Sequence, residues 1–142
     1  MKKLLIIVLA CFSINRAHSA DLVFWKEHLG EITIERFYLQ QIFTKRIAKW
    51  PDGTNINVYI KPLGSIEHKD FLFSVLGLSP FAYSQQLEAQ TFTGKATSVI
   101  EVANDTQLLM KIEKDPRAIG YINYDIYIGN KKVVVVDGDS VN

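Results

Sequence analysis

The chain has 142 residues, of which 48% are hydrophobic and 22% charged, with 16 basic and 15 acidic side chains. This near-balance of charge, without a basic run, excludes a polyanion-binding stripe, so nucleic acid is not an expected partner. Cys11 is the single cysteine, which excludes an internal disulfide and a cysteine-rich metal site.

Residues 1–20 have the pattern of a secretory signal peptide. Two lysines precede a short apolar run, and small residues follow it. The pattern predicts export to the periplasm, with cleavage after Ser19 or Ala20. The run is shorter than the roughly 20 apolar residues that a membrane-spanning helix needs. A loose lipobox that ends at Cys11 leaves acylation on that cysteine as an alternative.

Cleavage at this point leaves residues 21–142, enough for a single domain with its own core. All 15 acidic residues follow position 20, whereas three of the 16 basic residues precede it. The formal charge of the mature chain is therefore 13 − 15, or −2.

The first part of this domain predicts a strand, a helix, a turn and a second strand. Residues 21–26 read as a strand, and the apolar residues between positions 34 and 42 recur at helical spacing. The segment 50–53, Trp-Pro-Asp-Gly, has the residues of a tight turn. A strand is expected at 56–60.

Two helices are expected next. The first covers residues 67–76 and ends with Gly77 as its C-cap. Ser79 and Pro80 have the residue types of an N-cap and a first helical position, and they open a helix that we expect to end near Glu88.

A further helix and two strands complete the pattern. Asn104 caps a helix that ends before Pro116, and this role is preferred over glycosylation of the formal Asn-Asp-Thr sequon. The short β-branched runs at 118–122 and 132–136 are typical of strands buried on both faces. Strands that alternate with helices predict an α/β fold, a mostly parallel sheet flanked by helices.

Three segments, in this order, resemble the substrate-binding protein family of phosphate ABC transporters, and together they extend over about residues 34–123. They are 42–45 with 50–53, similar to "IF.GK...W.DG"; 71–77 with 91–95, similar to "F...VLG...FTGK"; and 115–121, similar to "PGAIGY" with Arg117 in place of a glycine.

The resemblance implies a periplasmic-binding-protein-like lobe that is not an enzyme. Large members of the family have two such lobes and clamp the anion between them, whereas 122 residues suffice for one. The implied ligand is a small oxyanion such as phosphate, bound weakly, and the implied partner is a membrane transporter or sensor. The alternative is a periplasmic protein–protein interaction module that has lost ligand binding, with a second copy of the chain as one candidate partner.

The resemblance also locates a ligand site. Large members place an arginine and a Ser-Gly-Thr at a helix start before a phenylalanine. Counting back from Phe71, the Ser-Gly-Thr positions hold Glu67, His68 and Lys69, and Leu63 falls near the arginine position. The family ligands are therefore missing, and Glu67 introduces a negative charge.

Ser65, His68 and Lys69 are the candidate ligand-binding residues, because they lie where a strand hands over to a helix. Lys69 supplies the permanent positive charge, and His68 would strengthen anion binding as the pH falls through about 6.5. The alternative interpretation is a solvated first turn in which Glu67 favours the helix dipole.

Other sequence motifs give weaker evidence for a metal or catalytic site. His28 and Glu31 offer two metal ligands where zinc needs three or four, so we expect a surface loop. Asp137-Gly138-Asp139 is too near the end at Asn142 for a calcium loop and is interpreted as a polar tail. No nucleophile elbow, phosphate loop or metal triad is present, so neither catalysis nor a cofactor is expected.

Four aromatic residues are expected in the core or at strand edges rather than on a binding platform. They are Trp25, Tyr59, Tyr121 and Tyr124.

Overall fold

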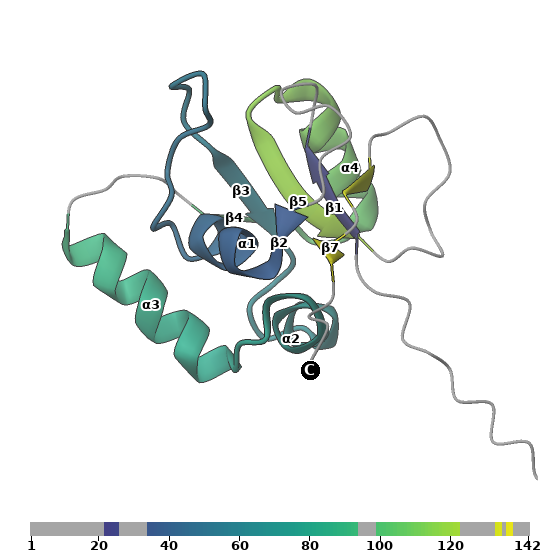
Figure 1. Cartoon of the computed structure of the whole chain (residues 1–142). Coiled ribbons are helices and arrows are strands. Elements are labelled where there is room, and N and C mark those ends of the chain that lie inside the picture. Colours follow the sequence, from purple (N-terminus) through teal and green to yellow (C-terminus); the bar gives the residue numbers. More distant parts are fainter. Residues whose placement is uncertain (1–21, 26–33, 94–98, 123–132, 135, 138–142) are drawn as a thin grey trace, which may run out of the picture.

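The computed structural model describes residues 22–25, 34–93, 99–122, 133–134 and 136–137 (Figure 1). The expected signal peptide with Cys11, and the segment from His28 to Glu31, lie outside these ranges. Within them, no helix combines the length and apolarity that crossing a membrane requires. The elements are β1 (Leu22–Trp25), β2 (Ile34–Glu35), α1 (Arg36–Phe43), β3 (Asn57–Ile60), α2 (Ile66–Phe71), η1 (Leu72–Leu76), α3 (Pro80–Phe92), β4 (Val99–Glu101), α4 (Asp105–Lys114), β5 (Ala118–Ile122), β6 (Val133–Val134) and β7 (Val136–Asp137).

The main sheet has the strand order β4-β3-β5-β1-β6. Strand β3 pairs in parallel with both β4 and β5, which confirms the expected parallel sheet in its central part. Strand β1 runs antiparallel to both β5 and β6. The three-residue strand β4 forms one edge of this order. Because the chain leaves β3 toward β4 and then crosses to β5 on the other side, the topological switch point lies between β3 and β5.

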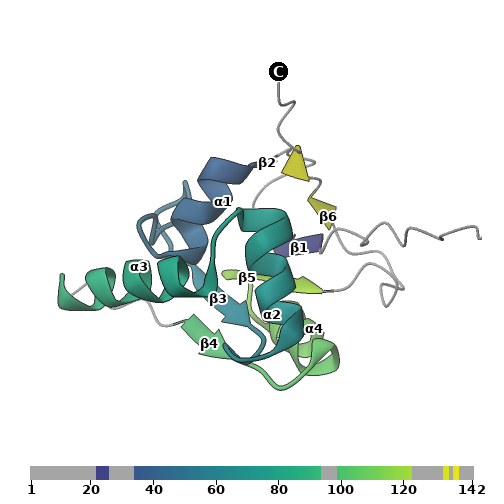
Figure 2. The same ribbon diagram turned by 90° about the horizontal axis from the view of Figure 1, so that it is seen from below.

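Helices cover both faces of the sheet, as Figures 1 and 2 show. Side chains alternate along β3 and β5, so each strand contributes to two separate clusters. On one face Val58, Ile60, Ile119 and Tyr121 pack against α1, α2, η1 and Tyr83 of α3. On the other face Tyr59, Ala118 and Ile122 pack against Leu108 and Ile112 of α4.

Gly120 permits the close approach of α4 to the sheet. A Cβ atom at this position would lie 3.1 Å from Leu108 Cδ2, 3.2 Å from Ile112 Cδ1 and 3.2 Å from the backbone oxygen of Tyr59. One of these neighbours is backbone and cannot rotate away. The glycine is therefore required by packing, although its φ is not positive.

The helix starts agree with the sequence. Ser65, Ser79 and Asn104 are N-caps whose side-chain oxygens accept bonds from the backbone N–H groups of residues 68, 82 and 107. Gly77 ends the helical segment with φ 64°. Lys45 also takes a left-handed conformation, with φ 63°, at the position where the "IF.GK" pattern has glycine.

Four element boundaries differ from the expectations. Helix α3 continues four residues beyond Glu88 to Phe92, and Ile34 lies in β2 rather than in α1. The apolar run at 132–136 contributes strands to two sheets. Strand β6 pairs with β1 in the main sheet, and β7 pairs with β2 in a second, two-stranded sheet. Asp137, expected in a polar tail, pairs with Glu35 in this second sheet.

The aromatic expectations are confirmed where the structure describes them. Tyr59 and Tyr121 are buried, and Tyr121 stacks on Phe71 with ring centroids 3.8 Å apart. The side chains of Trp25 and Tyr124 lie outside the described part of the chain.

A polar cluster closes the amino ends of β3 and β5. Asp115 accepts hydrogen bonds from Asn57 Nδ2 at 2.7 Å, from Tyr59 Oη at 2.9 Å and from the backbone nitrogen of Arg117 at 2.9 Å. The buried Trp50 donates its indole N–H to the Arg117 oxygen at 3.0 Å. The Trp-Pro-Asp-Gly turn is thus tied to the start of β5.

Candidate functional site

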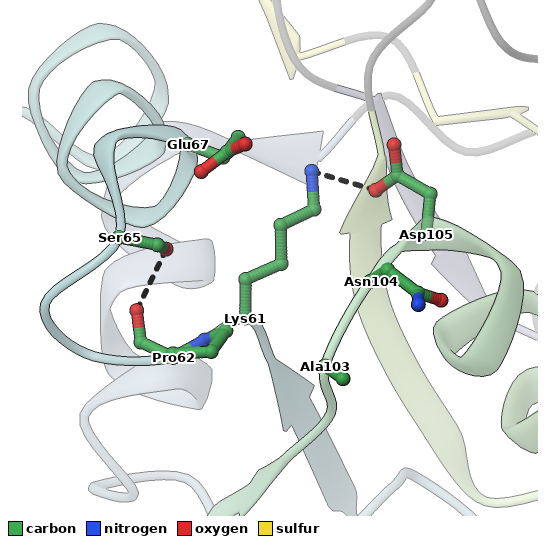
Figure 3. A pocket seen from close by; sticks show the side chains of 7 residues that line it. All are labelled: Lys61, Pro62, Ser65, Glu67, Ala103, Asn104 and Asp105. Atoms are coloured by element: carbon green, nitrogen blue, oxygen red, sulfur yellow. Dashed lines mark hydrogen bonds and ion pairs between the residues drawn. The ribbon is translucent and has the colours of Figure 1, made fainter.

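A pocket of about 160 Å³ opens where β3 and β4 end (Figure 3). One wall follows β3 and the other follows β4. The lining residues are Lys61, Pro62, Ser65, Glu67, Ala103, Asn104 and Asp105. In open α/β sheets ligands bind beyond the carboxyl ends of the strands, next to a switch point. The pocket lies at these carboxyl ends, between β3 and β4, and borders the switch point through β3.

An ion pair crosses this pocket. Lys61 Nζ lies 2.6 Å from Asp105 Oδ1, and the two side chains are only 5% and 13% exposed. The Lys61 ammonium also lies 5.5 Å from the centroid of the Tyr121 ring. Lys61 follows β3 directly, and Asp105 is the first residue of α4. The pair therefore joins the two walls of the pocket.

Two helices begin at the pocket, and their capping side chains are already engaged. Ser65 Oγ donates to the Pro62 oxygen at 2.7 Å and accepts from the His68 nitrogen at 3.2 Å. Asn104 Oδ1 accepts from the Gln107 nitrogen at 3.0 Å. The positive ends of α2 and α4 still face this region, which favours a negatively charged group there.

His68 lies beneath the pocket rather than in it. It is 1% exposed, and its Nδ1 lies 2.6 Å from Tyr121 Oη, which accepts the backbone N–H of Lys61 at 3.1 Å. The Tyr121 hydroxyl has a second acceptor site as well as its own proton, so either group can donate in this bond, according to the tautomer of His68. Nε2 makes no hydrogen bond within the described residues. Burial lowers the pKa of His68 to about 4.

The three candidate residues are not brought together in one site. Ser65 lines the pocket, His68 is buried below it, and Lys69 is exposed and absent from the lining. Since the pKa of His68 is about 4, a pH dependence centred on 6.5 is not expected from this residue. The binding roles of Ser65, His68 and Lys69 stay predictions.

Sequence reasoning missed Lys61 and Asp105 as a pair. A lysine directly after a buried strand and an aspartate directly after a helix cap were the available signals. Neither signal links the two positions, because they are 44 residues apart and meet only when β3 and β4 lie side by side. Elsewhere in the described residues, no group of three or more His, Cys, Asp or Glu side chains is placed to hold a metal ion.

The parallel strands with helices on both faces define the class of the fold, an α/β lobe, and its fold is like that of one lobe of a periplasmic binding protein. The chain is similar to an ABC-type phosphate transport receptor from Vibrio cholerae, with TM-score 0.62, 14% identity, and coverage of 84% of this chain and 47% of the other. It is also similar to a putative phosphate ABC transporter substrate-binding protein with bound phosphate from Clostridium perfringens, with TM-score 0.62, 16% identity, and coverage of 84% and 45%.

A third similar structure is PstS from Borrelia burgdorferi, with TM-score 0.51, 18% identity, and coverage of 72% of this chain and 40% of that one. The chain therefore spans less than half the length of these proteins. No protein-family model and no curated protein matches the chain. At these identities the similarity shows the fold, so the expected resemblance is confirmed at that level.

Proposed function

We propose that the chain is an exported, non-enzymatic module that recognises a small oxyanion such as phosphate weakly, in the service of transport or sensing. The observation that carries the proposal is the buried Lys61 in a pocket at the carboxyl ends of β3 and β4. A cation beside two helix starts suits an anion. The fold shared with phosphate-binding proteins and the signal-like residues 1–20 support the same function.

The charges of the pocket explain why binding should be weak. Asp105 already neutralises Lys61, and Glu67 adds a second carboxylate to the lining. Three or four charge-assisted hydrogen bonds, at roughly 1.5 to 3 kcal/mol each, must offset an association cost of about 4 to 15 kcal/mol. A dissociation constant near 1 mM corresponds to only about −4 kcal/mol, which fits that balance.

Chemical-shift mapping by NMR, with phosphate and sulfate titrated separately, tests the site. We expect shifts at residues 61–65 and 103–105, and their loss in Lys61→Met. Lys111→Met is the matched control, because Lys111 is an exposed lysine in the last turn of α4. Lys69→Ala in the same titration tests the residue predicted from the sequence.

Two outcomes would count against the proposal. Shifts confined to other parts of the fold would remove the anion from this pocket, and no shifts at tens of millimolar would remove it altogether. Binding at micromolar concentration would instead favour capture for transport.

A protein–protein interaction module that has lost ligand binding is the second candidate. The observation that favours it is a pair of exposed apolar side chains on the helical segment formed by α2 and η1. Ile66 is 73% exposed and Phe73 is 60% exposed, and the residues between them on the same face, Lys69 and Asp70, are charged and exposed. Aromatic side chains such as that of Phe73 are enriched at protein interfaces. Light scattering after size-exclusion chromatography tests self-association, and a monomer at high concentration would count against that form of the module.

A further inference from the structure

The walls of the pocket carry more negative than positive charge. Its ionisable lining residues are Lys61, Glu67 and Asp105, one cation against two carboxylates. A simple oxyanion that reaches Lys61 must therefore approach at least one carboxylate of the same sign. This arrangement suits a ligand that carries its own positive charge.

The geometry provides separate places for the two charges of such a ligand. In Figure 3 the Lys61 ammonium lies between Glu67 on one side and Asp105 on the other. Asp105 is bound to Lys61, whereas Glu67 is exposed and no bond joins it to Lys61 in that view. An ammonium carries three donors, so Lys61 can hold Asp105 and still bind a further oxygen. Glu67 is then available to a cation.

We propose that the pocket selects a small zwitterion, an aminoalkyl phosphate, whose oxyanion contacts Lys61 and whose ammonium contacts Glu67. This proposal rests on the oxyanion function proposed above and names the ligand class of the same site. An ion pair near the surface is worth about 0.2 to 1 kcal/mol, which corresponds to at most about fivefold in affinity.

The test is a calorimetric or NMR titration with 2-aminoethyl phosphate and with ethyl phosphate, which lacks the ammonium. We expect the amino compound to bind more tightly, by up to about fivefold, the upper limit for one such ion pair. Glu67→Gln should remove most of this preference. Glu88→Gln, an exposed glutamate on α3, is the control and should keep it.

The outcomes separate this proposal from the one on which it rests. If ethyl phosphate binds as tightly as the amino compound, the zwitterion is excluded and the oxyanion function stands. A preference that survives Glu67→Gln also overturns the assignment. If no phosphate compound binds at tens of millimolar, both proposals fail.

The same pair of charges occurs free and in a lipid headgroup. Flotation with vesicles of phosphatidylethanolamine, with and without free 2-aminoethyl phosphate as competitor, distinguishes these sources. Competed flotation identifies the headgroup, and absence of flotation with retained binding of the free compound identifies a soluble ligand. Flotation that the free compound does not compete, and that Glu67→Gln does not reduce, would contradict binding through this pocket.

Discussion

The two ends of the parallel strands both carry polar side chains, but they use them differently. At the amino end, three donors converge on Asp115, and the cluster is closed by the Trp50 indole. At the carboxyl end, Lys61 and Asp105 form one ion pair in an open pocket beside Glu67, which has no bond to either of them in Figure 3. A polar cluster whose bonds are all internal supports the fold, whereas a pocket with remaining donors and acceptors can bind a ligand.

The titration behaviour of the two ends reflects this difference. Burial raises the pKa of Asp115, but bonds from Asn57, the Arg117 backbone and Tyr59 outweigh burial and hold it below the usual value. Burial, together with the bond to Asp115, raises the pKa of Tyr59 to about 12. Beneath the pocket, burial alone lowers the pKa of His68. The carboxyl end should therefore be the more acid-sensitive end.

The largest expected effect is the loss of stability on acidification through His68. Between pH 6.5 and about 4 the unfolded chain binds a proton at His68 that the folded chain does not, so stability falls as the pH falls. The shift of the His68 pKa from 6.5 to about 4, at 1.36 kcal/mol per pKa unit, corresponds to a loss of about 3 kcal/mol in the free energy of unfolding. Urea denaturation at pH 7 and pH 4.5 should show the loss.

His68→Asn keeps a hydrogen-bonding partner for Tyr121 Oη and removes the titrating group, so the slope between these pH values should flatten. An unchanged slope would show that another group controls acid sensitivity.

Asp115 acts in a lower pH range. Because its pKa in the folded chain is depressed, its contribution to the free energy of unfolding is present at neutral pH and is lost only as the pH falls through that pKa.

Asp115→Ala breaks the amino-end cluster and should cost about 2 kcal/mol of unfolding free energy, because the Asn57 and Tyr59 donors lose their acceptor. Asp115→Asn retains one acceptor oxygen and should cost about half as much. Urea midpoints measure both variants. A cost of Asp115→Ala below that of Asp115→Asn would contradict the structural role given to this carboxylate.

The Lys61–Asp105 pair should show a smaller coupling, of about 1 kcal/mol, because the pocket admits water to a pair that is otherwise buried. The double-mutant cycle of Lys61→Met and Asp105→Asn measures it. Coupling as large as the Asp115 effect would mean that the carboxyl end also serves mainly to support the fold.

The two serine N-caps should have equal effects on stability and different effects on phosphate binding. Ser65→Ala and Ser79→Ala should each cost about 1 kcal/mol, since each removes an N-cap bond. Only Ser65→Ala should also change the affinity for phosphate, because only Ser65 lines the pocket. Equal effects of the two variants on phosphate titrations would remove Ser65 from the binding site.

Sequence patterns predicted most of the helices and the central strands, since caps and apolar spacing are local signals. They missed β4, because Val99-Ile100-Glu101 is too short to show alternation. They also gave no direction for β1, since strand direction depends on pairing rather than on periodicity.

For the site, the sequence located the strand-to-helix turn that contains Ser65. The burial of His68 was available from the pattern, because His68, Phe71, Leu72 and Val75 lie at i, i+3, i+4 and i+7 on one helical face. The same spacing places Lys69 on the exposed side. The Lys61–Asp105 pair could not be predicted, because it depends on which two strands become neighbours.

The short strand β4 limits how easily another β-strand can add to this edge of the sheet. Among the described residues at this edge, β4 offers the backbone groups of Val99–Glu101 to an added strand, and Glu101 is exposed. An intruding chain would gain few ladder bonds there and would meet a charge at the end of the strand. Short, charged edges are a common protection against edge-to-edge aggregation. The lobe can thus present its carboxyl end to ligands while its β4 edge stays a poor template for amyloid-like growth.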